Sequence, residues 1–201
     1  MYQMPGSLCG IRLIRPSDQY PGMLSSEETV LVVVDIQGKL AQLMHDREGL
    51  FSNAKKMIRG AGILELPIIW VEQNPRGLGP TVPEIAELMP GISPISKMTF
   101  SCAGNSEFTR RLESLGRKHV LLLGIETHVC IYQSAMDLLE LGYRVHVIAD
   151  AVSSRTEENK RLALTKIRDL GATLTTTETA LFELLKVAEG PRFKAMLEIV
   201  R

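Results

Sequence analysis

Six short runs rich in valine, isoleucine, leucine and threonine recur along the chain, and patterns typical of helices lie between them. Short β-branched and apolar runs predict strands that are buried on both faces, as in a parallel sheet covered by helices. This alternation therefore constrains the fold more than any other feature of the chain. The expected strands are residues 29–34, 68–71, 95–96, 120–123, 144–149 and 173–176.

The alternation of strands and helices predicts an α/β architecture. We expect a three-layer, Rossmann-like fold whose six-stranded parallel sheet has the order 3-2-1-4-5-6, with helices on both faces. A capping box formed by Ser154 and Glu157 is predicted to begin the helix after the fifth strand. With 201 residues, the chain is long enough for one well-packed domain and short for two.

Residues 1–22 differ in composition from the rest of the chain. They contain several prolines and glycines, and they lack the charged region followed by an apolar region that marks a secretion signal. We expect them to be an N-terminal extension, upstream of the fold or non-native, and residues 23–201 to form the domain. No apolar run approaches the roughly 20 residues of a membrane span, so we expect no membrane association.

The charge balance and the cysteines limit the class of partner and the compartment. The chain has 23 lysines and arginines against 23 aspartates and glutamates, so no broad basic face is expected for nucleic acid. The three cysteines are odd in number and form no C-x-x-C pair, which favours a reducing, cytoplasmic location over a disulfide framework.

Reactive side chains follow the ends of five predicted strands: Asp35, Glu72, Lys97, Cys130 and Asp150. In an open parallel sheet the carboxyl ends of the strands form the ligand-binding edge. Asp35, Lys97 and Cys130 would supply a proton acceptor, a cation and a nucleophile. At a strand-to-helix turn, backbone N–H groups would favour the thiolate of Cys130 and hold an oxyanion. Taken singly, each residue also has an explanation that involves no catalysis: Cys130 could be an inert buried thiol, Asp35 a turn-forming residue and Lys97 a solvated charge.

Three segments in order resemble the hallmark segments of the isochorismatase-like cysteine hydrolases: VVVDIQ at 32–37, KMTFS at 97–101 and GIETHVC at 124–130. Two more, EQNPRGLGPT at 72–81 and ADAVSSR at 149–155, are most similar to the small isochorismatase-domain-containing proteins, whose substrate is undefined. The resemblance covers residues 28 to about 194.

This resemblance implies that Asp35, Lys97 and Cys130 are a catalytic triad. It also implies a cis peptide bond between Ile125 and Glu126, with the backbone N–H groups of Glu126 and Cys130 as the oxyanion hole. The implied activity is cofactor-free hydrolysis of a small amide or ureido C–N bond through a thioester. The alternatives are a vinyl-ether hydrolase that does not need the thiol, a non-catalytic scaffold or partner-binding protein, and a thiol redox sensor in which Cys102 resolves Cys130.

We expect a small-molecule substrate, no metal and no nucleotide cofactor. The loop after the second strand lacks the Asp-x-His segment of metal-dependent relatives, the histidines are scattered, and no G-x-G-x-x-G or Walker sequence is present. A homo-oligomer is expected, with the apolar residues 193–200 as a candidate surface. The candidate substrate-binding residues are Gln37, Phe100, Thr127 and His128. Two of them have a structural alternative: Gln37 could tie two loops together, and Phe100 could belong to the core.

Overall fold

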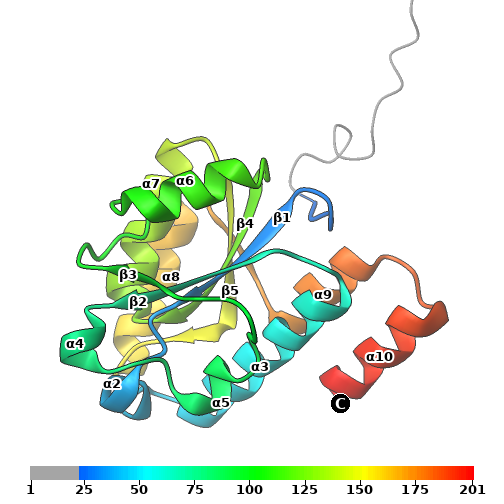
Figure 1. The fold of residues 1–201 in the computed structure, drawn as a ribbon, viewed down its shortest axis with the longest axis horizontal. Helices are drawn as coiled ribbons and strands as arrows, with labels where there is room; N and C mark the ends of the chain where they lie inside the picture. Colours follow the sequence, from blue (N-terminus) through cyan, green and yellow to red (C-terminus); the bar gives the residue numbers. More distant parts are fainter. Residues whose placement is uncertain (1–22) are drawn as a thin grey trace, which may run out of the picture.

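The computed structural model describes residues 23–201, so the predicted extension of residues 1–22 lies outside the described part of the chain. The described residues form three layers around a single parallel sheet (Figure 1). The sheet has six strands in the order β3-β2-β1-β4-β5-β6, which confirms the predicted topology. The strands are β1 (Thr29–Val34), β2 (Ile68–Gln73), β3 (Ile95–Lys97), β4 (His119–Ile125), β5 (Arg144–Ser153) and β6 (Thr173–Thr175).

The helices cover both faces of the sheet and create two apolar cores (Figure 1). On one face α3, α9 and α10 contribute Ala54, Ala180 and Met196 to the first core. On the other face α6, α7 and α8 contribute to the second. Within residues 23–201, no helix has the length and apolar character needed to cross a membrane. The helices are α2 (Gly38–Gln42), α3 (Arg47–Ile63), α4 (Pro75–Leu78), α5 (Pro83–Ala86), α6 (Ser106–Ser114), α7 (Tyr132–Glu140), α8 (Glu157–Asp169), α9 (Thr177–Leu185) and α10 (Gly190–Val200), with a π-helical turn, η1 (Thr127–Ile131), before α7.

The predicted capping box at Ser154 and Glu157 is wrong. Strand β5 continues to Ser153, and α8 is capped two residues later by Thr156, whose hydroxyl accepts from the N–H of Asn159 at 3.2 Å. Ser154 is buried, and its hydroxyl lies 2.9 Å from Nδ1 of His128. Pairing of β5 with its neighbour in the sheet therefore outweighs the local capping signal.

The apolar C-terminal stretch packs against the domain through one fully buried residue, Met196. Helix α10 contacts α3 and α9, and Met196 is fully buried between them. Two polar contacts hold the helix: Lys56 Nζ donates to the Val200 carbonyl at 3.1 Å, and Arg192 pairs with Glu65 at 2.8 Å. Phe193, Leu197, Ile199 and Val200 remain partly exposed, so the candidate oligomer surface at residues 193–200 remains a prediction.

The carboxyl ends of β1 and β4 form the switch point of the sheet. From β1 the chain proceeds outward to β2 and β3 on one side, and then returns to β4 beside β1 on the other. Gly124 lies opposite Val34 with φ of 125°, and a Cβ atom there would lie only 1.9 Å from the Val34 carbonyl oxygen. Only glycine permits this close approach, which draws the ends of the two strands together.

Two stacked histidines lie inside the sheet region, one on β4 and one on β5. His119 and His146 are both buried, with ring centroids 5.1 Å apart and Nδ1 of His119 3.0 Å from Nε2 of His146. Burial lowers the pKa of His146 to about 4, and it also lowers the pKa of His119. The folded protein therefore holds this pair neutral at neutral pH.

We predict that this pair makes stability depend on pH. An unfolded histidine has a pKa of about 6.5, so below that pH the unfolded state takes up protons before the folded state does. The free energy of unfolding should then fall as the pH drops from about 6.5 towards 4. Replacing His146 with Gln should reduce this loss by up to about 3 kcal/mol, measured by urea unfolding at a series of pH values. His45→Gln, at an exposed histidine, is the control and should follow the unmodified protein; a His146→Gln curve that does so too would contradict the prediction.

Candidate functional site

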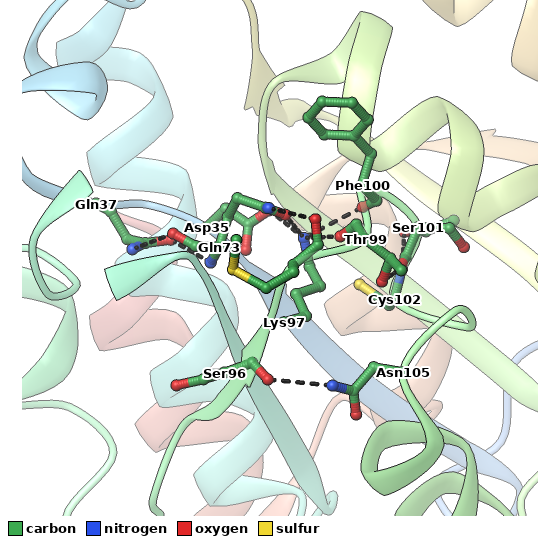
Figure 2. Close-up of polar contacts among 12 residues, drawn as sticks. Asp35, Gln37, Gln73, Ser96, Lys97, Thr99, Phe100, Ser101, Cys102 and Asn105 are labelled. Atoms are coloured by element: carbon green, nitrogen blue, oxygen red, sulfur yellow. Dashed lines mark hydrogen bonds and ion pairs between the residues drawn. The ribbon is translucent and has the colours of Figure 1, made fainter. Parts of the chain in front are cut away.

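The three predicted reactive residues meet at the carboxyl edge of the sheet, although 95 positions separate the first from the last. Asp35 follows β1, Lys97 ends β3 and Cys130 lies in η1 after β4. Lys97 Nζ is 2.7 Å from Asp35 Oδ2 (Figure 2), and the Cys130 thiol is near enough to lower the pKa of the Asp35 carboxyl. All three side chains are almost completely buried. The fold thus places a carboxylate, an ammonium and a sulfur in one cluster.

The ammonium of Lys97 is fully occupied by protein acceptors. Besides Asp35, it donates to Gln73 Oε1 at 2.8 Å, to the Phe100 carbonyl at 3.1 Å and to the Thr99 carbonyl at 3.4 Å (Figure 2). An ammonium has three N–H groups, so four acceptors leave none free for a substrate. Lys97 could therefore influence a bound molecule only through its charge.

The carboxylate of Asp35 has one occupied and one free oxygen. The residue adopts a left-handed backbone conformation with φ of 54°, uncommon for a residue other than glycine, and this turn directs it into the cluster. Burial raises the pKa of Asp35, while the charge of Lys97 opposes that rise. Oδ1 is buried and has no partner in hydrogen-bonding geometry among residues 23–201. It is therefore available to accept a proton from the neighbouring thiol.

The resting thiol of Cys130 is not activated by the turn on which it lies. Burial raises its pKa, the negative charge of Asp35 raises it further, and the charge of Lys97 only partly opposes both. Strand β4 also leads into a π-helical turn before α7 begins at Tyr132. The sequence-based prediction that this turn favours the thiolate is therefore wrong for the resting site. The sulfur would have to lose its proton before it could act as a nucleophile.

The turn before Cys130 has the backbone that the family resemblance implies. The Ile125–Glu126 peptide bond is cis. The Glu126 carbonyl accepts from the N–H groups of Val129 and Ile131, at 3.1 and 3.2 Å. The assignment of the Glu126 and Cys130 N–H groups as an oxyanion hole remains a prediction.

Gln37 has the structural role that was the alternative to substrate binding. Its side chain is fully buried, and its amide donates to the carbonyls of Gln73 and Gly79 at 3.1 and 2.7 Å. Its Oε1 accepts from the Gln73 N–H at 2.6 Å. Both amide hydrogens are thus used within the protein, and Gln37 ties the loops after β1 and β2 together.

Gln73 was missed as a member of the site. It supports Lys97 with Oε1, and its Nε2 donates to the Met98 carbonyl at 2.9 Å. The sequence predicts strand β2 only as far as Val71, two residues short of Gln73, whereas sheet pairing places Gln73 opposite Lys97. Only the register between β2 and β3 reveals that Gln73 lies beside Lys97.

The other predicted substrate-binding residues differ in exposure. The Phe100 side chain is 52 % exposed and its ring points away from Lys97 (Figure 2), so the residue is not part of the core. His128 is about one quarter exposed and contacts Ser154, whereas Thr127 is fully buried, and its hydroxyl has no partner among residues 23–201. Phe100 and His128 are therefore accessible to a ligand, and substrate contact by all three remains a prediction.

Glu72 and Asp150 were predicted to follow strands, but they lie within them, because β2 continues to Gln73 and β5 to Ser153. Both have structural partners. Glu72 accepts from the Thr81 N–H at 2.7 Å, and Asp150 accepts from the N–H and hydroxyl of Thr177 at 2.8 and 2.9 Å. Cys102 is fully buried, and burial raises its pKa to about 12. These residues stabilise the edge of the sheet around the cluster.

A surface hollow of about 440 Å³ adjoins the cluster through Lys97. In the described part of the chain, no three side chains of His, Cys, Asp or Glu gather closely enough to hold a metal ion. The residues that line the hollow are Asn74, Pro75, Arg76, Ser96, Lys97 and Met98.

Known proteins share both the sequence pattern and the fold. Residues 29–179 match the family described as the isochorismatase domain. Isochorismatase domain-containing protein 2 of Danio rerio is 39 % identical over 180 residues, which cover 89 % of this chain and 90 % of that protein. The structure of the MAR1 ribonuclease from Caenorhabditis elegans is 35 % identical, with a TM-score of 0.83, and the match covers 89 % of this chain and 92 % of that one. YcaC of Escherichia coli, described as an octameric hydrolase of unknown specificity, is 24 % identical with a TM-score of 0.83, covering 88 % of each chain.

We predict that replacement of Lys97 by Met destabilises the protein strongly. The change leaves the Asp35 carboxylate without its cation and several buried acceptors without a donor. Breaking a buried pair on one side costs roughly 3 to 5 kcal/mol, which urea unfolding would measure. Lys118→Met is the matched control, because that exposed ammonium is 3.8 Å from Glu28 and should contribute less than about 1 kcal/mol. Equal losses in the two variants would show that the buried pair contributes no more than a surface contact.

Proposed function

This chain belongs to the isochorismatase family, and from that membership we propose that it is a cysteine hydrolase that cleaves a C–N bond of a small amide or ureido compound. The observation that carries the proposal is the buried contact of Lys97 with Asp35, at 2.7 Å, beside the thiol of Cys130. These groups are the base, the fixed charge and the nucleophile that acyl transfer needs.

The proposed reaction begins with attack by the Cys130 sulfur on the carbonyl carbon, while the thiol proton passes to Asp35 Oδ1. The resulting oxyanion is held by the backbone N–H groups of Glu126 and Cys130. Asp35 then returns the proton to the departing nitrogen, so that ammonia or an amine leaves and a thioester remains. Water, deprotonated by Asp35, attacks the thioester carbonyl carbon. The C–S bond then breaks, Asp35 returns the proton to the sulfur, and the carboxylic acid is released with the Cys130 thiol restored.

Lys97 supports this cycle by keeping Asp35 ionised between proton transfers. Burial alone would hold the carboxyl neutral, and the adjacent ammonium opposes that effect. As the pH falls through the pKa of Asp35, the base is lost and the rate should decline. Because the three groups are coupled, the decline belongs to the cluster as a whole.

A second candidate function is suggested by the ribonuclease relative, which is 35 % identical to this chain. With equal numbers of acidic and basic residues, this chain has no excess of cations for a phosphate backbone. We therefore place RNA cleavage second and include an RNA substrate in the test below. The remaining alternatives are a vinyl-ether hydrolase, a non-catalytic scaffold and a thiol redox sensor in which Cys102 resolves Cys130.

We predict that Cys130→Ala abolishes ammonia release from a panel of amides and ureides, by roughly a thousandfold or more, because the nucleophile is lost. Cys102→Ala is the control and should retain turnover, since Cys102 has a structural position. In the same samples, iodoacetamide should alkylate Cys130 faster than the fully buried Cys102.

Unchanged ammonia release in Cys130→Ala would refute the thioester route. Retained turnover of isochorismate in that variant would favour the vinyl-ether reaction, and cleavage of RNA would favour the second candidate. Absence of any turnover, with Cys130 alkylated no faster than Cys102, would favour the scaffold.

We also propose that the chain forms a homo-oligomer in the cytoplasm, since a relative with the same fold is described as octameric. Light scattering coupled to size exclusion should give a mass that is a multiple of 22.3 kDa. A single species at 22.3 kDa across micromolar concentrations would contradict this prediction.

A further inference from the structure

An arginine at the same edge of the sheet is held in place by the turn that contains Cys130. Glu126 directly precedes η1, and its carboxylate is only 10 % exposed. Oε2 of Glu126 accepts from both the backbone N–H and Nε of Arg155, each at 3.1 Å. The buried carboxylate therefore fixes Arg155 at two points.

The outer end of the Arg155 side chain remains available. The side chain is 57 % exposed, and within residues 23–201 its guanidinium donates no hydrogen bond other than that from Nε. The two terminal nitrogens thus have no acceptor in this part of the chain. A guanidinium held at Nε and free at its outer edge is preorganised to bind a carboxylate through two parallel hydrogen bonds.

The sheet fixes where this guanidinium lies relative to the proposed chemistry. Strands β4 and β5 are paired so that Ile125 is opposite Ser153, which brings Glu126 and Arg155 together just beyond the two strand ends. The N–H of Glu126 is one of the two proposed oxyanion donors. The same residue would therefore hold the reacting carbonyl through its backbone and Arg155 through its side chain.

Lys97 cannot take this role, because its three N–H groups are shared among four protein acceptors. Arg76 is the other arginine to consider, since it lines the hollow beside Lys97. No hydrogen bond from the Arg76 side chain to a residue in 23–201 fixes its position, whereas Arg155 is anchored. Arg76 is therefore the natural comparison.

We infer that Arg155 is a specificity-determining residue that binds a carboxylate of the substrate, so that the substrates are small amide or ureido acids. This inference rests on the proposed function for its reaction, but binding of the carboxylate can be tested without turnover.

The test measures how anions protect Cys130 of the full chain from iodoacetamide, by mass spectrometry of the Cys130 peptide. Malonate, succinate and glutarate provide carboxylates with different spacers, and succinamide is the neutral comparison. At least one dicarboxylate should slow alkylation of the unmodified protein and of Arg76→Gln. Arg155→Gln should need at least about ten times more of it for equal protection, and succinamide should not protect.

Arg155→Lys keeps the charge but loses the fork, so it should show intermediate protection even if Arg155→Gln perturbs the turn. Alkylation of each variant without anion reports whether the site is intact. The inference is overturned if no dicarboxylate protects, if succinamide protects equally, or if the loss follows Arg76 and not Arg155.

A turnover measurement then separates this inference from the proposed function. Succinamate should have a kcat/KM at least about tenfold above that of its methyl ester, and Arg155→Gln should abolish the difference mainly through KM. Anion protection that depends on Arg155 without hydrolysis of any amide would leave the binding role standing and refute the proposed reaction. Hydrolysis that does not discriminate between the acid and the ester would refute the role of Arg155 alone.

Discussion

A buried ammonium dictates the arrangement of the site. Lys97 has no exposed side-chain surface, and an unpaired charge in that position would cost several kcal/mol, so oxygen atoms from three segments converge on it. The loop after β3 supplies two of these oxygen atoms, because the carbonyls of Thr99 and Phe100 point inward to Lys97. The side chains of Met98 and Phe100 are consequently left 73 % and 52 % exposed beside the cluster. One interaction thus opposes the rise that burial causes in the pKa of Asp35, and it shapes the surface around the cluster.

The electrostatics of the cluster favour proton transfer over a preformed thiolate. Burial and the charge of Asp35 raise the pKa of Cys130, whereas a cysteine activated by a helix terminus alone would show the opposite shift. The free Oδ1 of Asp35 provides the acceptor that this arrangement needs. In the proposed reaction, the thiol is therefore activated by its neighbour at the moment of attack, and remains protonated otherwise.

Much of the fold could be predicted because the apolar runs along the chain agree with the burial of the corresponding strands in the sheet. The run at 30–34 is apolar throughout, and the corresponding strand is buried along its entire length. Errors arose where partners distant in sequence decide the outcome. Ser154 carries a capping signal, yet pairing of β5 and contact with His128 take precedence. Gln37 was a candidate for substrate contact, but carbonyls at the end of β2 and in the loop after it accept both of its amide hydrogens.

The sequence by itself determined the order of strands and helices, the residues that could react and the family resemblance, because these depend on side-chain periodicity and residue type along the chain. Only the tertiary structure decided that Lys97 is saturated by four protein acceptors, that Gln73 is one of them and that Glu126 anchors Arg155. The contacts of Gln73 and of Glu126 depend on sheet register. Such distances are set by packing between strands, and no local pattern encodes them.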